Sequence, residues 1–305
     1  MPQFLETWAV GLALVMGRNL PARAVAPVGH ALGRVAFAAG VRRRVCFENL
    51  HRAFGSEAGP DAQAALARRA YEHLGQSFLE FLRLPRAAPA TLRDGLALTG
   101  EEHLRAALGA GRGAIIASGH LGNWEVVGAG LAARGYPVTF VVQKLRNSQV
   151  DELVQGIRRG TGIEVVERGM DLRRAHAALA ANRLVFFMCD QDARRRGMFI
   201  PLFGIPASTP KGAAQMALRC GAPFLPSFGW RVAPGSFRGD FTPPVDPGSG
   251  DEDDQVRMLL TTFNARLEAA VRRAPEQYWW AHRRWKTAPP PAPVPPLGPP
   301  ALPVA

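Results

Sequence analysis

The chain has 305 residues, of which 47% are hydrophobic, so it can bury a full core and is not intrinsically disordered. Its formal net charge is +12, and almost all of its 37 basic residues are arginines. Arginine binds phosphate and carboxylate bidentately, so the charge indicates either an anionic partner or the codon usage of a GC-rich genome. No nucleic-acid-binding module is recognisable, and we expect no nucleic-acid partner.

The cysteines and histidines give no reason to expect a metal ion. Cys46, Cys189 and Cys220 are widely spaced and form no CxxC pair. This spacing argues against a disulfide framework and a zinc site, and it is typical of a reducing compartment. The histidines form no HExxH or HxH cluster. We therefore expect neither a metal nor a resident cofactor.

The first apolar stretch is short. Residues 8–17, WAVGLALVMG, are bracketed by Glu6 and Arg18, whereas a helix that spans a bilayer needs ~20 apolar residues. The residues before this stretch lack the positive charge of a secretory signal. Two interpretations are open: an interfacial helix with Trp8 at its edge, or a plain core helix.

The remainder of residues 1–95 has helical patterning over 25–39, 41–54 and 61–83. An arginine triplet at 42–44 is either a solvated face or a binding site for anionic head groups. We therefore predict that residues 1–95 form an N-terminal helical region that associates with a membrane surface.

From about residue 96 the pattern changes to alternating strands and helices, which predicts an α/β core over residues 96–287. The central sheet should be mainly parallel and flanked by helices. The tail over 288–305 is nearly all Pro, Ala, Leu and Val, so we predict that it is disordered or polyproline-like. The expected strands are 114–117, 137–142, 164–167, 184–189, 224–232 and 237–241, and the expected helices are 101–110, 124–134, 148–159, 172–181, 210–220 and 256–273.

One stretch carries the clearest chemical signal. A buried strand over 114–117 ends at a glycine, His120 follows, and Glu125 comes five residues later inside a predicted helix. On one regular helix the two side chains would point about 140° apart. They can act together only if His120 precedes the helix, and Gly119 and Gly122 permit the turn that this requires.

An imidazole held by a carboxylate is the usual general base for a hydroxyl, because its pKa lies near neutrality. The alternative is a structural histidine that has no part in chemistry. The strand end, the flanking glycines and the downstream acid favour a catalytic His120 oriented by Glu125.

Several motifs resemble one known family. The sequence GHLGNWE at 119–125 resembles the H-x-x-x-x-[DE] motif of the lysophospholipid-acyltransferase-like superfamily, and in detail the H-x-G-N-W-E of its late (secondary) lipid A acyltransferases. The segment VRRRVCFENLHRAF from Val41 resembles that family's N-terminal motif. The block of Asp190-Gln191 and residues 200–226, and PEQYWWAHRRWKT from Pro275, resemble its downstream motifs.

This resemblance implies transfer of an acyl chain from an acyl-carrier-protein thioester to a hydroxyl of a lipid A precursor. His120 would be the base and Glu125 its orienter. No acyl-enzyme is implied, and the sequence has no G-x-S-x-G elbow. The expected partners are acyl carrier protein, a glycolipid acceptor and the cytoplasmic face of the inner membrane. The alternatives are an acyl-CoA-dependent enzyme for another glycolipid, such as a phosphatidylinositol mannoside, and a non-catalytic lipid-binding relative.

Two sets of residues are candidates for contacts with the substrate near the histidine. Backbone amides of the 119–123 turn and Arg146 could stabilise the oxyanion. Asn123 belongs to the same turn, where we expect it to shape the backbone. Asp190 follows a buried strand, where site residues of α/β sheets gather, and it either joins the site or ties down a loop through arginines 194–196.

The downstream motifs supply further binding candidates. Thr209 is expected to cap a helix, and Lys211 beside it could bind a phosphate at the helix N-terminus. Arg283 and Arg284 lie among tryptophans, a mixture that suits a membrane interface or a phosphorylated head group. The alternative is that these tryptophans pack in the core.

Overall fold

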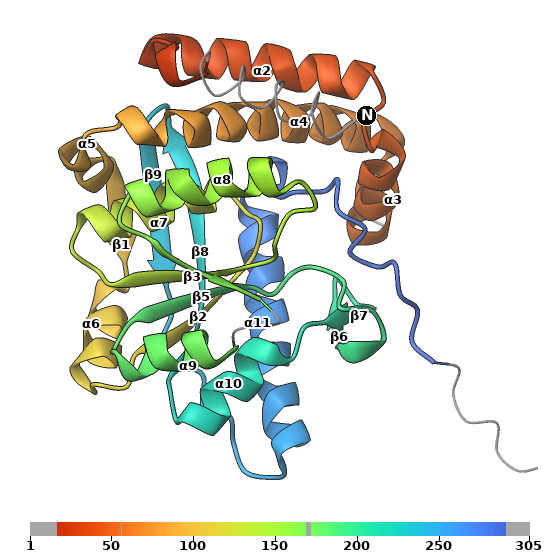
Figure 1. The fold of residues 1–305 in the computed structure, drawn as a ribbon. Helices are drawn as coiled ribbons and strands as arrows, with labels where there is room; N and C mark the ends of the chain where they lie inside the picture. The colour runs from red at the N-terminus through yellow and green to blue at the C-terminus, as the bar shows by residue number, and fades with distance from the viewer. Residues whose placement is uncertain (1–16, 56, 169–171, 291–305) are drawn as a thin grey trace, which may run out of the picture.

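The protein is described here by a computed structural model covering residues 17–55, 57–168 and 172–290. It contains a mostly parallel seven-stranded sheet with helices on both faces, and helices of the N-terminal region lie along one end of it (Figure 1). The predicted fold class is thereby confirmed. Residues 8–16 of the first apolar stretch, for which two interpretations are open, and most of the proline-rich tail lie outside the described residues.

The sheet has the strand order β1-β9-β8-β2-β5-β3-β4. All neighbouring strands are parallel except β8 and β9, which form an antiparallel hairpin. The strands are β1 (Leu96–Thr99), β2 (Ala114–Ser118), β3 (Val138–Val142), β4 (Glu164–Glu167), β5 (Leu184–Met188), β8 (Phe224–Ala233) and β9 (Ser236–Phe241).

The helices of the core divide between the two faces of the sheet. Side chains of α6, α7 and α8 pack with Ala114 and Ile116, whereas those of α9, α10 and α11 pack with Ile115 and Ala117. Strand β2 is therefore buried on both faces, which explains its unbroken apolar sequence. The core helices are α6 (Glu101–Gly109), α7 (Trp124–Ala133), α8 (Ser148–Gly160), α9 (Leu172–Ala180), α10 (Gly212–Cys220) and α11 (Glu252–Arg273).

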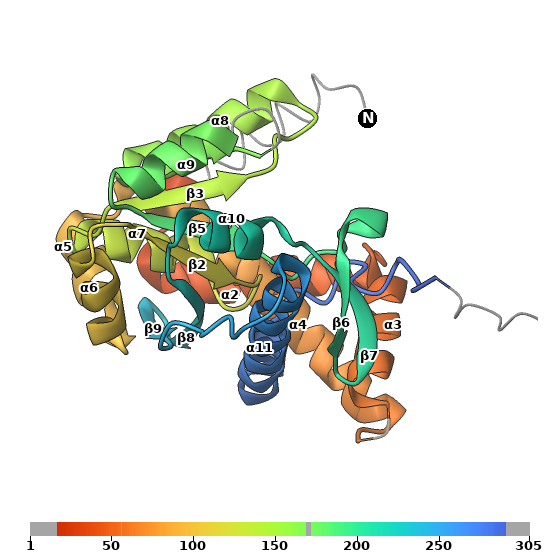
Figure 2. The same ribbon diagram turned by 90° about the horizontal axis from the view of Figure 1, so that it is seen from below.

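Three elements were not predicted from the sequence: β1, the short helix α5 (Pro89–Asp94), and a hairpin of β6 (Met198–Leu202) and β7 (Ile205–Thr209). The hairpin lies beside α11, apart from the sheet (Figure 2). Each of its strands contains a proline, which argues against a strand within a larger sheet but is tolerated in a two-stranded ribbon.

Helix α11 starts at Glu252, four residues before the predicted start at residue 256. Asp251 caps it by accepting a hydrogen bond from the backbone N–H of Asp254 at 2.9 Å. The acidic side chains of its first turn lie at the positive end of the helix dipole, where carboxylates are stabilising.

The N-terminal region consists of α2 (Ala22–Ala38), α3 (Arg43–Phe54) and α4 (Pro60–Arg83). Helix α2 lies along α4 (Figure 1), and glycines allow their backbones to come very close. A Cβ on Gly33 would lie 2.1 Å from the carbonyl oxygen of Tyr71, and one on Gly75 would lie 2.1 Å from that of Gly29.

Within the described residues, no single helix has the length and apolarity to cross a bilayer; α2 and α3 meet that test only as a pair, across a 94° bend.

We predict that Gly33→Ala destabilises the protein by about 1–3 kcal/mol, because the added methyl group must push α2 away from α4. Gly109→Ala at the end of α6 is the matched control, since its Cβ would meet nothing within 4 Å. Urea unfolding measures both variants. Equal stability of the two would contradict the close packing of α2 on α4.

Candidate active site

His120 lies just beyond the carboxyl end of β2, and Asp190 lies just beyond the carboxyl end of the neighbouring strand β5. Asp190 accepts two hydrogen bonds from the same residue: Oδ1 is 2.7 Å from the His120 ring Nδ1, and Oδ2 is 2.7 Å from its backbone N. The carboxylate thus fixes both the ring and the backbone. Because Nδ1 carries the proton in this contact, Nε2 of the neutral ring is left as the basic nitrogen.

Asp190 stays ionised although it is only 3% exposed. Burial opposes its charge, but the electrostatic attraction and hydrogen bonds from His120, followed by the charge of Arg284, together lower the pKa of Asp190. Burial and the neighbouring Asp190 raise the pKa of Tyr278 well above its ordinary value, so its phenol remains neutral. The site therefore contains one buried carboxylate whose charge is balanced from two sides.

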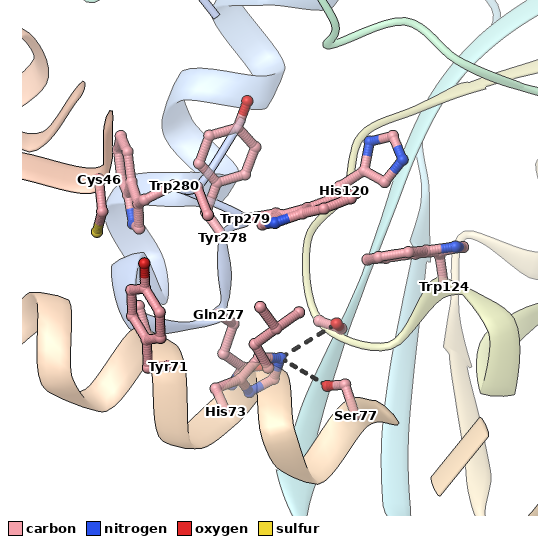
Figure 3. Close-up of a pocket in the computed structure, with 14 residues that line it drawn as sticks. Cys46, Tyr71, His73, Ser77, His120, Trp124, Gln277, Tyr278, Trp279 and Trp280 are labelled. Atoms are coloured by element: carbon pink, nitrogen blue, oxygen red, sulfur yellow. Dashed lines mark hydrogen bonds between the residues drawn. The ribbon is translucent and has the colours of Figure 1, made fainter. Parts of the chain in front are cut away.

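His120 also lines a small pocket, together with residues of α4 and of the 275–287 segment. Figure 3 shows His120 at one end of this pocket with the rings of Trp124 and Trp279 beside it. The His120 ring meets both indoles edge-on, with centroid distances of 4.7 and 5.1 Å. The side-chain nitrogen of Gln191 lies 3.5 Å from His120 Nε2. The ring thus lies against two indoles, and its Nε2 has one side-chain amide beside it.

The segment 275–287 pairs with the turn that carries His120. Trp279 N donates to His120 O at 3.0 Å, and Gly122 N donates to Gln277 O at 2.9 Å. The segment is in turn held by Asn49 of α3, whose amide donates to the carbonyls of Trp280 and His282 at 2.7 and 2.5 Å. The N-terminal and C-terminal sequence motifs thus meet behind the active-site turn.

The prediction that Glu125 orients His120 is wrong, because Asp190 occupies that position. Arg158 of α8 donates to both oxygens of Glu125, at 3.0 and 2.5 Å. The indole N–H of Trp124 donates to the same carboxylate at 3.1 Å. Glu125 therefore holds the Trp124 ring that packs against His120, and any effect on the imidazole passes through that ring.

Asn123 and the amides of the turn have structural roles. Asn123 caps α7 by accepting from Val126 N, and it is 2% exposed. The predicted oxyanion donors in the turn are largely committed, since His120 N bonds Asp190 and Leu121 N bonds Gly119 O. With Gly122 N also occupied, these three amides are not free to receive an oxyanion.

The downstream candidates Thr209 and Arg284 do not face the pocket. Arg284 is 1% exposed and donates to Ser208 O at 2.7 Å and to Thr209 Oγ1 at 2.8 Å. Thr209 is fully buried at the end of β7 and does not cap α10, which begins at Gly212. Arg284 instead supports the site through Asp190, whose pKa it helps to lower.

The remaining candidates lie at the surface. Lys211 is a partly exposed residue whose ammonium is 3.9 Å from Asp253. Arg146, in the loop after β3, and Arg283 are exposed, and neither is among the described residues that line the pocket. Of the tryptophans near Arg283, Trp280 and Trp285 pack in the core, and half-buried Trp279 contacts His120.

Some residues of the site escaped sequence reasoning. Arg158 had no local pattern to mark it, and Gln191 belongs to the Asp190-Gln191 motif but was given no role. His73 on α4 also lines the pocket, at the wall opposite His120 (Figure 3). Its Nε2 lies 3.1 Å from the carbonyl oxygen of Gly122, and its helical spacing alone would place it in a core stripe.

A histidine held by a buried aspartate at the end of a parallel strand could take a proton from a hydroxyl group. Comparison with known proteins gives the class. Residues 1–287 match the family described as bacterial lipid A biosynthesis acyltransferase. The chain belongs to this family of acyltransferases, as its motifs indicated.

Relatives with two kinds of name are similar to this chain. A phosphatidylinositol mannoside acyltransferase of Mycolicibacterium smegmatis is 29% identical over 260 residues, which cover 80% of this chain and 84% of the relative. The protein of that name from Mycobacterium tuberculosis is 30% identical over 230 residues, covering 73% and 72%. The lipid A biosynthesis lauroyltransferase of Escherichia coli is 25% identical over 291 residues, covering 94% of each chain.

His73 gives a prediction for stability against pH. Burial, followed by the charge of Arg231, lowers the pKa of His73 to about 3. The unfolded chain therefore binds a proton near pH 6.5 that the folded chain refuses until about pH 3, so stability falls as the pH falls through this window. In His73→Gln, which keeps a side-chain donor, the loss of unfolding free energy between pH 7 and pH 5 should be about 2 kcal/mol smaller than in the wild type. Chemical denaturation at pH 7 and at pH 5 measures the unfolding free energy of both proteins. An equal loss of unfolding free energy in the wild type and the variant would contradict a neutral buried His73.

Proposed function

We propose that the chain transfers a fatty acyl group from a thioester to a hydroxyl of a glycolipid, with His120 as the general base. The observation that carries the proposal is the 2.7 Å contact between His120 Nδ1 and Asp190, which leaves Nε2 as the basic nitrogen of a histidine that lines the pocket. A non-catalytic lipid-binding protein would need no such oriented base.

The reaction follows from this geometry. The acceptor hydroxyl gives its proton to Nε2 of His120 while its oxygen attacks the thioester carbonyl carbon. The resulting imidazolium is stabilised by Asp190 across Nδ1. The tetrahedral intermediate then expels the thiolate as the C–S bond breaks, and the imidazolium returns the proton to the sulfur. No acyl-enzyme is needed.

The oxyanion of that intermediate needs a donor placed in advance. Since the amides of residues 120–122 are committed, the side-chain amide of Gln191 is the candidate closest to the reacting edge, 3.5 Å from His120 Nε2. Trp124 and Trp279 exclude water from the same edge, which strengthens each of these electrostatic contacts.

For the acceptor we propose a lipid A precursor, in keeping with the family matched over residues 1–287 and with the relative that aligns over 94% of the chain. A phosphatidylinositol mannoside is the second candidate, favoured by the higher identities of 29% and 30% to acyltransferases named for it.

We propose acyl carrier protein as the donor and the cytoplasmic face of the inner membrane as the location. The net charge of +12 suits both an acidic carrier protein and an anionic membrane. Helix α2 exposes Val28, Leu32 and Val35 at helical spacing, a stripe suited to an interfacial contact beside the arginines at 42–44.

An in-vitro transfer assay tests this proposal. Labelled acyl-carrier protein and acyl-CoA are each offered with a lipid A precursor and with a phosphatidylinositol mannoside, and products are identified by mass spectrometry. We expect transfer from the carrier protein to the lipid A precursor, and its loss in His120→Ala. Transfer only to the mannoside would replace the acceptor by the second candidate. Full activity of His120→Ala would overturn the mechanism.

The two acidic residues should differ in effect. Asp190→Asn removes the anion that fixes the tautomer of His120, so kcat should fall by a factor on the order of 10²–10⁴. Glu125→Gln weakens the contact with Arg158 and loosens Trp124, so its loss should be smaller. Steady-state kinetics on both folded variants measure the difference. A larger loss in Glu125→Gln would contradict the assignment of Asp190.

A further inference from the structure

A buried polar network lies beneath the turn at 120–123, on the side away from Asp190, and the reaction itself does not account for it. Its centre is Arg231 of β8, whose side chain is 8% exposed. The guanidinium binds both oxygens of Glu80 on α4, with Nε to Oε1 at 2.7 Å and a terminal nitrogen to Oε2 at 2.6 Å. This is the fork geometry of a bidentate pair.

The same guanidinium makes two further contacts with α4. It donates to His73 Nδ1 at 2.6 Å and to Ser77 Oγ at 2.8 Å. His73, Ser77 and Glu80 are spaced by four and three residues, so they lie on one face of the helix. Three side chains of α4 therefore converge on a single arginine.

The network reaches the active-site turn at two points. His73, which accepts from Arg231 at Nδ1, donates from Nε2 to Gly122 O at 3.1 Å. Asn123 donates to Glu80 Oε2 at 2.8 Å and to Ser77 O at 3.1 Å. These bonds fix Gly122 and Asn123, two of the three residues between His120 and helix α7.

Arg231 also holds the segment that covers the turn from the other side. Its backbone N and O each bond the side-chain amide of Gln277 at 2.9 Å. The backbone carbonyl of Gln277 accepts from Gly122 N, and Trp279 N donates to His120 O. One arginine is thus linked to the turn through α4 and through the 275–287 segment.

We propose that Arg231 is a positioning residue for the reaction: with Glu80 and His73 it fixes the turn at 120–123, and thereby the position of His120. Arg231 touches no reacting atom. Asp190 holds the ring from β5, and the Arg231 network holds the backbone from α4 and β8. The proposal rests on the acyltransferase function proposed above.

Stability alone gives little reason for such a network, because a buried ion pair can often be replaced by apolar side chains of similar volume without loss. This provides the test variant, Glu80→Leu/Arg231→Met, which removes both charges together. His73 keeps its bond to Gly122 O, and Asn123 keeps its bond to Ser77 O. The variant loses the link between α4 and β8.

The matched control is Glu164→Leu/Arg183→Met. These side chains form an ion pair at 2.8 Å, and Arg183 also bonds Thr139 Oγ1 and Val138 O. They lie at the amino ends of β3, β4 and β5, the edge of the sheet opposite to His120. Loss of this pair, whose side chains are 25% and 37% exposed, removes an ion pair and two hydrogen bonds without touching the turn.

The experiment measures kcat and KM in the transfer assay, the melting temperature, and hydrogen–deuterium exchange of the Gly122 and Trp279 amides by NMR. In the folded Glu80→Leu/Arg231→Met variant, we expect kcat to fall at least tenfold with little change in KM, and both amides to exchange faster. The control should keep wild-type kcat and exchange.

Wild-type kcat and exchange in the folded test variant would overturn the proposal. If that variant does not fold, Arg231→Lys replaces it, because lysine keeps the charge but cannot bridge Glu80, His73 and Ser77 together; the same fall in kcat is then expected. Absence of transfer in the wild type would refute the proposed function, while the exchange of the two amides would still decide whether Arg231 fixes the turn.

Discussion

The site depends on the contact between Asp190 and His120, a pair of residues 70 positions apart that adjacent parallel strands bring together. The contact fixes the tautomer of the imidazole, and its second hydrogen bond fixes the backbone at the point where β2 ends. A buried carboxylate is costly unless it is paired and hydrogen-bonded. The charge of Arg284, which the β6–β7 hairpin holds in place, lowers the pKa of Asp190 and so helps to meet this cost. The phenol of Tyr278 stays neutral beside the carboxylate and adds no second negative charge.

The rest of the chain supports that contact from outside the sheet. Helix α4 supplies the polar wall under the turn, the 275–287 segment pairs with its backbone, and Asn49 of α3 holds that segment. The motifs that are scattered from residue 41 to residue 287 therefore serve one small region. Several of their polar residues are structural: Asn49, Asn123, Thr209 and Arg284 are all buried with protein partners.

The sequence predicted the sheet and the place of His120 because strand–helix alternation and glycine-bounded turns are local signals. It did not predict the partner of His120. Glu125 was favoured by its nearness in the chain, but it points to Arg158, whereas Asp190 was recognised only as a residue that follows a strand. Arg284 and Thr209 were predicted to bind substrate because a sequence motif does not show which of its side chains are buried. The convergence of α4 on Arg231 depends on tertiary packing and left no trace in the sequence.

The central claim is that Asp190, and not Glu125, accepts the hydrogen bond from the Nδ1–H group of His120. The most direct measurement is the low-field proton NMR resonance of that Nδ1–H group, assigned by its loss in His120→Gln. The resonance should persist in Glu125→Gln and disappear in Asp190→Asn. Its persistence in Asp190→Asn together with its loss in Glu125→Gln would contradict the account.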